Sequence, residues 1–278
     1  MEFKLISING QIVPKSEAKI DALSIESLYS FGVYETVKLR HGQIYFLDKH
    51  IDRIFHSASQ INLQHDLNVE NLNDYVIEFV RVLDIDSCNL KLLLLGGKNG
   101  EEPTFVIVPS APHYPDRTWY RDGVSMMSFV YERWMPQAKT LNMLPSYFYY
   151  KKAKSTGCYD CLYLDRSRNV LEGSRTNFYL IKGKQIISPP KEVVLEGVTM
   201  LSLEKVLAKT DYRIEYKTIT YSELLNYDSA FISSTSTKIL PVKSIDQKII
   251  FNISTELKNL IDIYESALDK STGKFENL

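Results

Sequence analysis

The amino-acid sequence predicts a mixed α+β (α/β) protein with two domains, in which strands and helices alternate along the chain. Short apolar runs with the period of β-strands recur between longer segments with the period of amphipathic helices. A chain of 278 residues can form one large domain or two of medium size. A connector rich in proline and charged residues lies near the middle of the chain, and it favours the arrangement with two domains.

Two β-hairpins are predicted at the start of the chain. In "FKLISINGQIV" the dipeptide Asn9-Gly10 separates two strand-like runs and supplies the positive φ angles of a tight turn. The runs "VYETVKL" and "IYFL", joined by "RHGQ", form a second hairpin by the same pattern.

Two amphipathic helices and two buried strands follow the hairpins. Apolar residues recur at helical spacing from Leu47 to Ile61, and Asp48 is the predicted N-cap. Residues 69–83 show the pattern of a second amphipathic helix. The continuous apolar runs "LKLLLL" and "TFVIVPS" are typical of buried strands.

A change of composition marks the predicted domain boundary. The segment "PSAPHYPDRTWYRDG", residues 109–123, contains three prolines and several charges, which is typical of a connector. We therefore predict a small N-terminal domain at residues 1–115, a linker at 116–123 and a larger C-terminal domain at 124–278 that carries Lys139. Its expected strands lie at 124–131, 160–165, 177–182, 213–219 and 229–233, and its expected helices at 146–155, from Thr199 and at 254–270.

The composition argues against several functional classes. A net charge of −1 gives no electrostatic attraction to nucleic acid or to an anionic membrane. No apolar run approaches the ~20 residues of a spanning helix, and no secretory signal is evident at the N-terminus. The five histidines show no metal-ligand spacing, so no metal site is predicted. The cytoplasm is the expected location.

The three cysteines do not form a disulfide framework. Cys158 and Cys161 form a C-x-x-C pair, which in other contexts carries redox or metal chemistry. They lie at the entry to an apolar strand, in "TGCYDCLYLD", and no second pair follows. We therefore predict that they pack in the core.

Two segments have the character of anion-binding sites. In "LEGVTML" a glycine precedes Val198 and Thr199, which open an amphipathic helix whose free N–H groups can hold a phosphate. The turn "SSTST", residues 233–237, presents hydroxyls and amides to an anion at the end of a strand. Taken alone, the first is more often a plain helix cap and the second an ordinary polar turn.

Three charged residues complete a pattern that none of them makes alone. Lys139 lies in "PQAKTLNML", Glu172 lies at a strand end in "VLEGSRTNFYL", and Arg53 lies off the apolar stripe of its helix. Each of them taken singly is expected to be a solvated surface charge. Together with the two anion-binding segments they match pyridoxal phosphate, which needs an amine for its aldehyde, a phosphate site and an acid near its pyridine nitrogen.

The chain also resembles a known family, the fold-type IV (class IV) pyridoxal-phosphate aminotransferases, which include D-amino-acid and branched-chain aminotransferases and aminodeoxychorismate lyase. The resemblance runs from "INGQIV" to "STKILPV" and rests on the ordered markers "FGVYETV", "HIDRI", "AKTLN", "LEGSRTN", "LEGVT" and "SSTSTKILPV". The pair "LEGSRTN" and "LEGVT" is its most specific part. The resemblance implies a two-domain enzyme that acts as a homodimer, with its cofactor site between the domains.

The resemblance further implies a role for each matching residue. Lys139 would form the internal Schiff base with pyridoxal 5'-phosphate, and Glu172 would bond the pyridine nitrogen. Leu195 would pack against the cofactor ring. The expected phosphate ligands are Arg53, Val198, Thr199, Thr235 and Ser236, and the expected substrate contacts are Tyr34 and Thr237.

The chain departs from the family pattern near the substrate. Ser30 and Phe31 replace residues that relatives often carry before the aromatic of "VYET". Gly96, with Lys98 nearby, stands where D-amino-acid aminotransferases have the arginine that binds the substrate carboxylate, and Met200 stands where an arginine is common. Another group must then bind the carboxylate, and the candidates are Arg121, Arg133 and Arg175.

Three functions stay open on the sequence. A transaminase that moves an amino group between an amino acid and a 2-oxo acid is favoured, because the turn "SSTSTK" is closer to the transaminases. The alternative is the pyruvate-releasing aminodeoxychorismate lyase, which uses the same lysine. The third is a non-catalytic binding protein of the same fold, and the joint presence of Lys139, Glu172, Arg53 and Thr199 argues against it.

Overall fold

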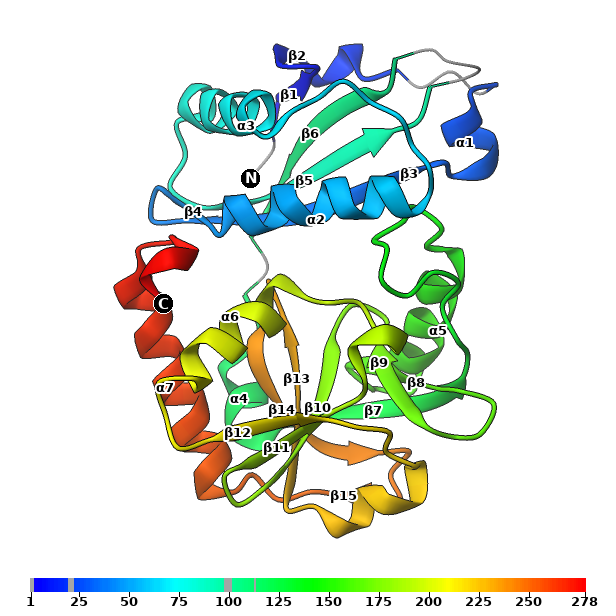
Figure 1. Cartoon of the computed structure of the whole chain (residues 1–278), viewed down its shortest axis with the longest axis vertical. Helices are drawn as coiled ribbons and strands as arrows, with labels where there is room; N and C mark the ends of the chain where they lie inside the picture. Colours follow the sequence, from blue (N-terminus) through cyan, green and yellow to red (C-terminus); the bar gives the residue numbers. More distant parts are fainter. Residues whose placement is uncertain (1–2, 20–22, 98–101, 113) are drawn as a thin grey trace. The chain divides into compact units, whose positions relative to one another are not determined.

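The computed structural model describes residues 3–19, 23–97, 102–112 and 114–278, so Lys98 lies outside the described residues (Figure 1). The chain divides into two compact units. The first comprises Met1–His113 with Ala138–Asn142 and Thr272–Asn277, and the second comprises Tyr114–Gln137, Met143–Ser271 and Leu278. Both units combine a sheet with helices, and the predicted α+β class is confirmed.

Within the described residues, the first unit is built on a six-stranded sheet in the order β2-β1-β6-β5-β3-β4. All of its neighbouring strands are antiparallel. Both predicted hairpins are confirmed, because Asn9-Gly10 and His41-Gly42 take positive φ angles between paired strands. The strands are β1 (Leu5–Ile8), β2 (Gln11–Pro14), β3 (Gly32–Arg40), β4 (Gln43–Tyr45), β5 (Cys88–Leu95) and β6 (Thr104–Ser110).

Helices α2 (Leu47–Gln60) and α3 (Val69–Leu83) cover one face of this sheet (Figure 1). Their apolar stripes pack on the alternate residues of β3, β5 and β6 that point to that face, and these side chains form the core of the unit. The predicted N-cap Asp48 is wrong: Phe46 is the N-cap, and Asp48 lies in the first turn, where its charge favours the helix dipole. The remaining helical segments are α1 (Ile25–Tyr29) and the 3-10 turns Lys15–Glu17 and Phe275–Asn277.

The structure differs from the predicted continuous domain at 124–278, because Ala138–Asn142 packs with the first unit. The Leu141 N–H donates to the Gly32 carbonyl at 3.0 Å, and Thr140 forms a bridge with Val33. The segment thus extends the sheet beside β3. Pairing between residues more than a hundred positions apart leaves no local trace in the sequence.

The predicted linker at 116–123 also differs from the structure, because it contains the short helix α4 (Arg117–Asp122). Asp116 caps this helix by accepting a hydrogen bond from the Thr118 N–H at 2.8 Å. Trp119 and Tyr120 pack against the core of the second unit. The segment is therefore part of that unit's packing.

The second unit is built on a nine-stranded sheet within the described residues, in the order β12-β11-β10-β13-β14-β7-β8-β9, with β15 paired to β14. All five predicted strands are present, whereas β9, β11, β14 and β15 were not predicted. The strands are β7 (Val124–Val130), β8 (Asp160–Leu164), β9 (Val170–Gly173), β10 (Asn177–Lys182), β11 (Gln185–Ser188), β12 (Arg213–Tyr216), β13 (Ser229–Ser234), β14 (Lys238–Ile245) and β15 (Ile249–Ile250).

The predicted helices of the second unit are confirmed as α5 (Leu144–Ser155), α6 (Val198–Leu207) and α7 (Thr255–Ser271). Two 3-10 turns lie at Lys191–Val193 and Tyr221–Asn226. Cys158 and Cys161 are buried and form no disulfide, so their predicted core packing is confirmed. Burial raises the pKa of the Cys161 thiol to about 12, which keeps it neutral.

Neither a membrane-spanning helix nor a metal-binding group of side chains is present in the part of the chain that the structure describes. Each of its helices is too short or too polar to cross a bilayer. In the same residues, no three histidine, cysteine, aspartate or glutamate side chains gather as metal ligands.

Candidate active site

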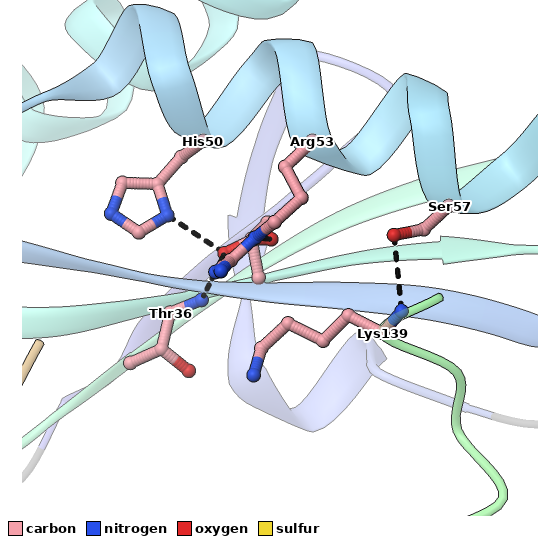
Figure 2. Close-up of polar contacts among 6 residues, drawn as sticks. Thr36, His50, Arg53, Ser57 and Lys139 are labelled. Carbon is pink, nitrogen blue, oxygen red and sulfur yellow. Dashed lines mark hydrogen bonds and ion pairs between the residues drawn. The ribbon is translucent and has the colours of Figure 1, made fainter. Parts of the chain in front are cut away.

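Lys139 lies on the segment that pairs with β3 in the first unit. Its carbonyl accepts a hydrogen bond from the Tyr34 N–H at 2.9 Å. Its own N–H donates to Ser57 Oγ at 3.0 Å, as Figure 2 shows. Its Nζ lies 4.5 Å from the centroid of the Tyr34 ring. The backbone of Lys139 is therefore fixed on both sides, and its amine reaches the residue that the sequence predicted on the substrate side.

Helix α2 presents His50, Arg53 and Ser57 on one side (Figure 2). Spacings of three and four residues place these side chains above one another. The apolar pattern of the helix left Arg53 outside its buried stripe and facing solvent. The side chain of Arg53 is in fact only 11% exposed, because its guanidinium turns to Glu35 on β3.

Glu35 is fully buried and binds two basic side chains of α2. Arg53 donates from Nε to Oε1 at 2.5 Å and from Nη2 to Oε2 at 2.7 Å, and His50 Nδ1 lies 2.7 Å from Oε2. Burial by itself would raise the pKa of Glu35, but the charge of Arg53 and the bonds from both partners outweigh it. The pKa of Glu35 therefore lies well below its ordinary value, and the carboxylate stays ionised.

His50 is the neutral member of this cluster. Burial lowers the pKa of His50 below its ordinary value of 6.5, and the attraction to Glu35 does not offset that effect. At neutral pH the ring is therefore uncharged, and its Nδ1–H donates to the Glu35 carboxylate.

Sequence reasoning missed Glu35 and His50. A signal for Glu35 was present, because it alternates with Val33 and Val37 on β3 and therefore shares their helix-covered face. An acid at such a position needs a basic partner, and the basic residues of α2 were available. The marker "FGVYETV" thus contains the acid of this buried cluster, and the marker "HIDRI" contains its two basic residues.

The buried cluster predicts that acid destabilises the protein in two stages. The folded-state pKa of His50 is depressed, so its contribution is present above about pH 6.5 and is lost as the pH falls below that value, by at most about 1.4 kcal/mol per pH unit. The pKa of Glu35 is also depressed, so its contribution persists to lower pH and is lost below about pH 4.5.

Denaturant unfolding at about pH 7.5 and about pH 5.5 measures the first stage. His50→Asn keeps an N–H donor near the position of Nδ1 but cannot ionise, so its unfolding free energy should change less over this interval. Equal pH dependence in the variant and the unaltered protein would show that His50 does not control the response.

In the second unit, both oxygens of the buried Glu172 are bound. Oε1 accepts from Arg133 Nη1 at 2.9 Å, and Oε2 accepts from the Leu195 N–H at 3.1 Å. The Leu195 carbonyl in turn accepts from Asn177 Nδ2 at 2.7 Å. The carboxylate at the end of β9 and the loop before α6 are thereby held in one fixed arrangement.

The start of α6 has no side-chain cap. Gly197 is its N-cap and contributes no side-chain hydrogen bond, so the first N–H groups of the helix are not capped by their own N-cap residue. A Cβ at Gly197 would lie 2.3 Å from Asn177 Oδ1, which explains why glycine occupies the position. Val198 and Thr199 follow in the first turn, and an uncapped helix start of this kind fits a phosphate.

The hydroxyl-rich turn after β13 has its own internal bonds. Ser234 Oγ and Thr237 Oγ1 are 2.7 Å apart, and the Thr237 carbonyl accepts from the Tyr120 hydroxyl at 2.8 Å. Thr237 is buried, whereas Thr235 and Ser236 at the tip are half-buried. The tip is thus the part of the turn that an anion can reach, while the Thr237 side chain is engaged with Ser234.

The predicted site residues therefore form two sets. Lys139, Tyr34 and Arg53 lie in the first unit, where β3 brings them together. The second set lies in the second unit, at the end of β9, the loop before α6, the start of that helix and the turn after β13, and comprises Glu172, Leu195, Val198, Thr199, Thr235, Ser236 and Thr237. An amine, a fixed carboxylate, an uncapped helix start and a hydroxyl turn are the groups that pyridoxal phosphate requires.

Comparison with known proteins identifies the family. The sequence profile of the amino-transferase class IV family matches residues 32–245. The chain is 27% identical to the D-alanine aminotransferase of Bacillus licheniformis, over 92% of its own length and 96% of the relative's. It is also 27% identical to the putative branched-chain-amino-acid aminotransferase of Methanocaldococcus jannaschii, over 89% and 90% of the two chains.

The fold agrees with this family. The solved branched-chain aminotransferase of Thermoproteus uzoniensis with norvaline aligns with a TM-score of 0.87 at 23% identity, covering 95% of this chain and 94% of the other. A hypothetical aminotransferase of Mycobacterium tuberculosis, solved with pyridoxal phosphate bound, aligns with a TM-score of 0.83 at 20% identity, covering 95% and 98%. The family profile spans most of the chain and includes Lys139, Glu172 and Thr199. The resemblance noted in the sequence is thus confirmed, and the chain belongs to the class IV aminotransferases, as a transaminase that depends on pyridoxal phosphate.

Proposed function

We propose that this transaminase uses Lys139 as its catalytic amine and Glu172 as the acid that holds the pyridine nitrogen of the cofactor. The observation that carries the proposal is the fixed position of Lys139, whose backbone bonds to Tyr34 and Ser57 and whose Nζ lies 4.5 Å from the Tyr34 ring centroid. A reacting amine needs such a fixed position, whereas a lysine on the solvated surface does not.

When bound, pyridoxal phosphate supplies an electron-withdrawing ring that stabilises negative charge at the substrate carbon beside the amine. Lys139 Nζ would hold the cofactor through its aldehyde, and as a free amine it would take the proton from the substrate α-carbon and deliver it to cofactor carbon C4′. Glu172 would keep a proton on the pyridine nitrogen. Its bonds to Arg133 and Leu195 support this role, because they fix the direction of the carboxylate.

The phosphate is assigned to groups that can donate hydrogen bonds. The N–H groups of Val198 and Thr199 at the start of α6 and the hydroxyls of Thr235 and Ser236 are suited to it. Arg53 adds a positive charge whose guanidinium is oriented by Glu35. Leu195 would pack on the ring, while Tyr34 and Thr237 are assigned to the substrate side.

The substrates are an amino acid and a 2-oxo acid. Relatives named D-alanine and branched-chain aminotransferases support transamination over the lyase and over a non-catalytic binding protein. A panel of L- and D-amino acids, read by the change in cofactor absorbance and accompanied by aminodeoxychorismate, tests this. Pyruvate release from aminodeoxychorismate without any amino-acid reaction would favour the lyase, and no response at all would favour the binding protein.

Glu172→Gln is expected to slow the half-reaction with the best donor by roughly 100-fold, while cofactor retention falls less. Glutamine keeps the size of the side chain and can still accept from the Leu195 N–H, but it lacks the charge that holds a proton on the pyridine nitrogen. Stopped-flow absorbance measures the rate and dialysis measures retention. Glu192→Gln, at an exposed residue of the same unit, is the control. Unchanged turnover in Glu172→Gln would contradict the assignment.

The proposed enzyme acts as a homodimer in the cytoplasm. Cys88, Cys158 and Cys161 are free thiols, which suits a reducing compartment. The exposed apolar side chains Tyr147 and Phe148 of α5 suit a subunit contact. Sedimentation of the purified protein at the mass of a single chain would contradict the dimer.

A further inference from the structure

A transaminase has to recognise the carboxylate that amino acids and 2-oxo acids carry beside the reacting carbon. A buried or half-buried carboxylate needs a cation or several N–H donors. The reacting amine is assigned to Lys139, so the search for this cation starts around Tyr34 and rests on the proposed function.

Phe31 excludes a cationic side chain at position 96. A Cβ built on Gly96 would lie 2.1 Å from Cδ1 and 2.5 Å from Cε1 of the Phe31 ring. The Gly96 N–H also donates to the Phe31 carbonyl at 2.9 Å, which keeps the two residues together. The two departures from the family pattern are therefore one change, in which an aromatic ring occupies the space where a side chain at 96 would begin.

The three arginines that the sequence left as candidates are engaged elsewhere. Arg121 is 72% exposed and pairs with the carboxylate of the next residue. Arg133 pairs with Glu172 at 2.9 Å. Arg175 stacks on Tyr150, with its Cζ 4.1 Å from the ring centroid.

Lys91 is a cation of the first unit that reaches the same aromatic ring as Lys139. It lies on β5 between Leu90 and Leu92, which point into the helix-covered core, so its side chain projects from the other face of the sheet. Its Nζ lies 5.0 Å from the centroid of the Tyr34 ring, and Lys139 Nζ lies 4.5 Å from it. The distance between the two Nζ atoms therefore cannot exceed the sum of these two distances.

Within the residues that the structure describes, Lys91 forms no ion pair. Its neighbours across the sheet are Thr36 on β3 and Val108 on β6, neither of which carries a charge. The side chain is half-buried, and an ammonium group in such surroundings lacks a counter-ion. A carboxylate bound beside Tyr34 would supply one.

We propose that Lys91 binds the carboxylate of the amino-acid and 2-oxo-acid substrates. An ammonium group is a point charge, so it fixes the position of a carboxylate but not its plane, unlike the planar fork of an arginine. The Tyr34 ring lies against both lysines and sets the distance between the binding cation and the reacting amine.

Lys91→Met tests this assignment, because methionine keeps the length of the side chain and removes its charge. The amino acid that reacts fastest with the unaltered holoenzyme is compared with its own carboxamide. For the amino acid, KM is expected to rise between about 10- and 100-fold in the variant, as for the loss of a charge-assisted hydrogen bond. The carboxamide reaction should be almost unchanged. Equal losses for both donors, or no loss for either, would overturn the assignment.

Two further variants guard against a structural explanation. Lys91→Arg restores a cation and should recover most of the affinity for the amino acid. If neither Lys91→Arg nor Lys91→Met binds the amino acid, Lys91 has a packing role and the assignment is overturned. Lys4→Met makes the same change of net charge at an exposed position before β1 and should leave KM unchanged. Cofactor absorbance of the Lys91 variants should match that of the unaltered holoenzyme, since Lys91 is not the residue assigned to the aldehyde.

Calorimetry with propionate and with 4-methylvalerate, two carboxylates that cannot react, separates this inference from the proposed function. Binding of either acid to the holoenzyme should weaken at least tenfold in Lys91→Met. A protein that reacts with no amino acid refutes the proposed function alone, because weaker binding of the acids would still support a carboxylate site at Lys91. Binding that is equal in both proteins would overturn the site whatever the enzyme does.

Discussion

Lys139→Ala is expected to abolish covalent attachment of pyridoxal phosphate and to slow transamination by about 10³-fold or more. The fold should persist, because the bonds from Tyr34 and to Ser57 use the backbone carbonyl and N–H of residue 139, which alanine retains. The substitution therefore removes the amine from an otherwise intact site. Borohydride reduction followed by peptide mapping measures attachment, and single-turnover absorbance measures the rate.

Lys15→Ala is the matched control, since Lys15 is exposed in the first unit and takes part in no predicted site. It should retain both the attached cofactor and the rate. A reduced cofactor found on another lysine of the unaltered protein would refute the assignment of Lys139. Retention of turnover in Lys139→Ala would refute its role as the proton carrier.

Glu35→Gln is expected to lower the free energy of unfolding by about 3 kcal/mol, which is the lower end of the range for breaking a buried ion pair. The amide keeps the size of the side chain but leaves the guanidinium of Arg53, only 11% exposed, without its counter-ion. One oxygen of the carboxylate also becomes an NH₂ group, which cannot accept from Arg53 or His50. Denaturant unfolding measures the loss.

Glu78→Gln provides the control for that experiment. Glu78 pairs with Arg81 on the outer side of α3, where both side chains are exposed, and such pairs contribute little to stability. A loss as small as that of the control would mean that the Glu35 cluster does not stabilise the unit. Cofactor retention should also fall in Glu35→Gln but not in Glu78→Gln, because Glu35 orients the arginine assigned to the phosphate.

Local patterns predicted the elements whose cause is local. The Asn9-Gly10 turn follows from the two residues that form it, and α3 follows from a regular apolar stripe. The missed strands β9 and β11 have four residues each and are almost entirely buried, so they lack the alternation that identifies a half-exposed strand. Their existence depends on neighbours far along the chain.

The same distinction applies to the candidate site. The uncapped start of α6 was predictable, since glycine followed by an amphipathic run is visible in the sequence. The partnership of Glu172 with Arg133 was not, because nothing in either segment indicates that the strand ends meet. Likewise, the apolar periodicity of α2 predicted that Arg53 faces solvent, because the pattern of one helix carries no information about a buried acid on a neighbouring strand. Motifs thus indicated the candidate reacting groups, whereas the groups that support them became visible only in the structure.

The short stretch Ala138–Asn142 is joined at both ends to residues of the other unit, Gln137 and Met143. A recombination event that carried residues 1–113 into a new gene would therefore leave Lys139, the proposed catalytic amine, behind. The reciprocal segment would carry it away from its supporting strand and helix. Neither segment taken alone would therefore hold Lys139 together with the strand and helix that its backbone contacts.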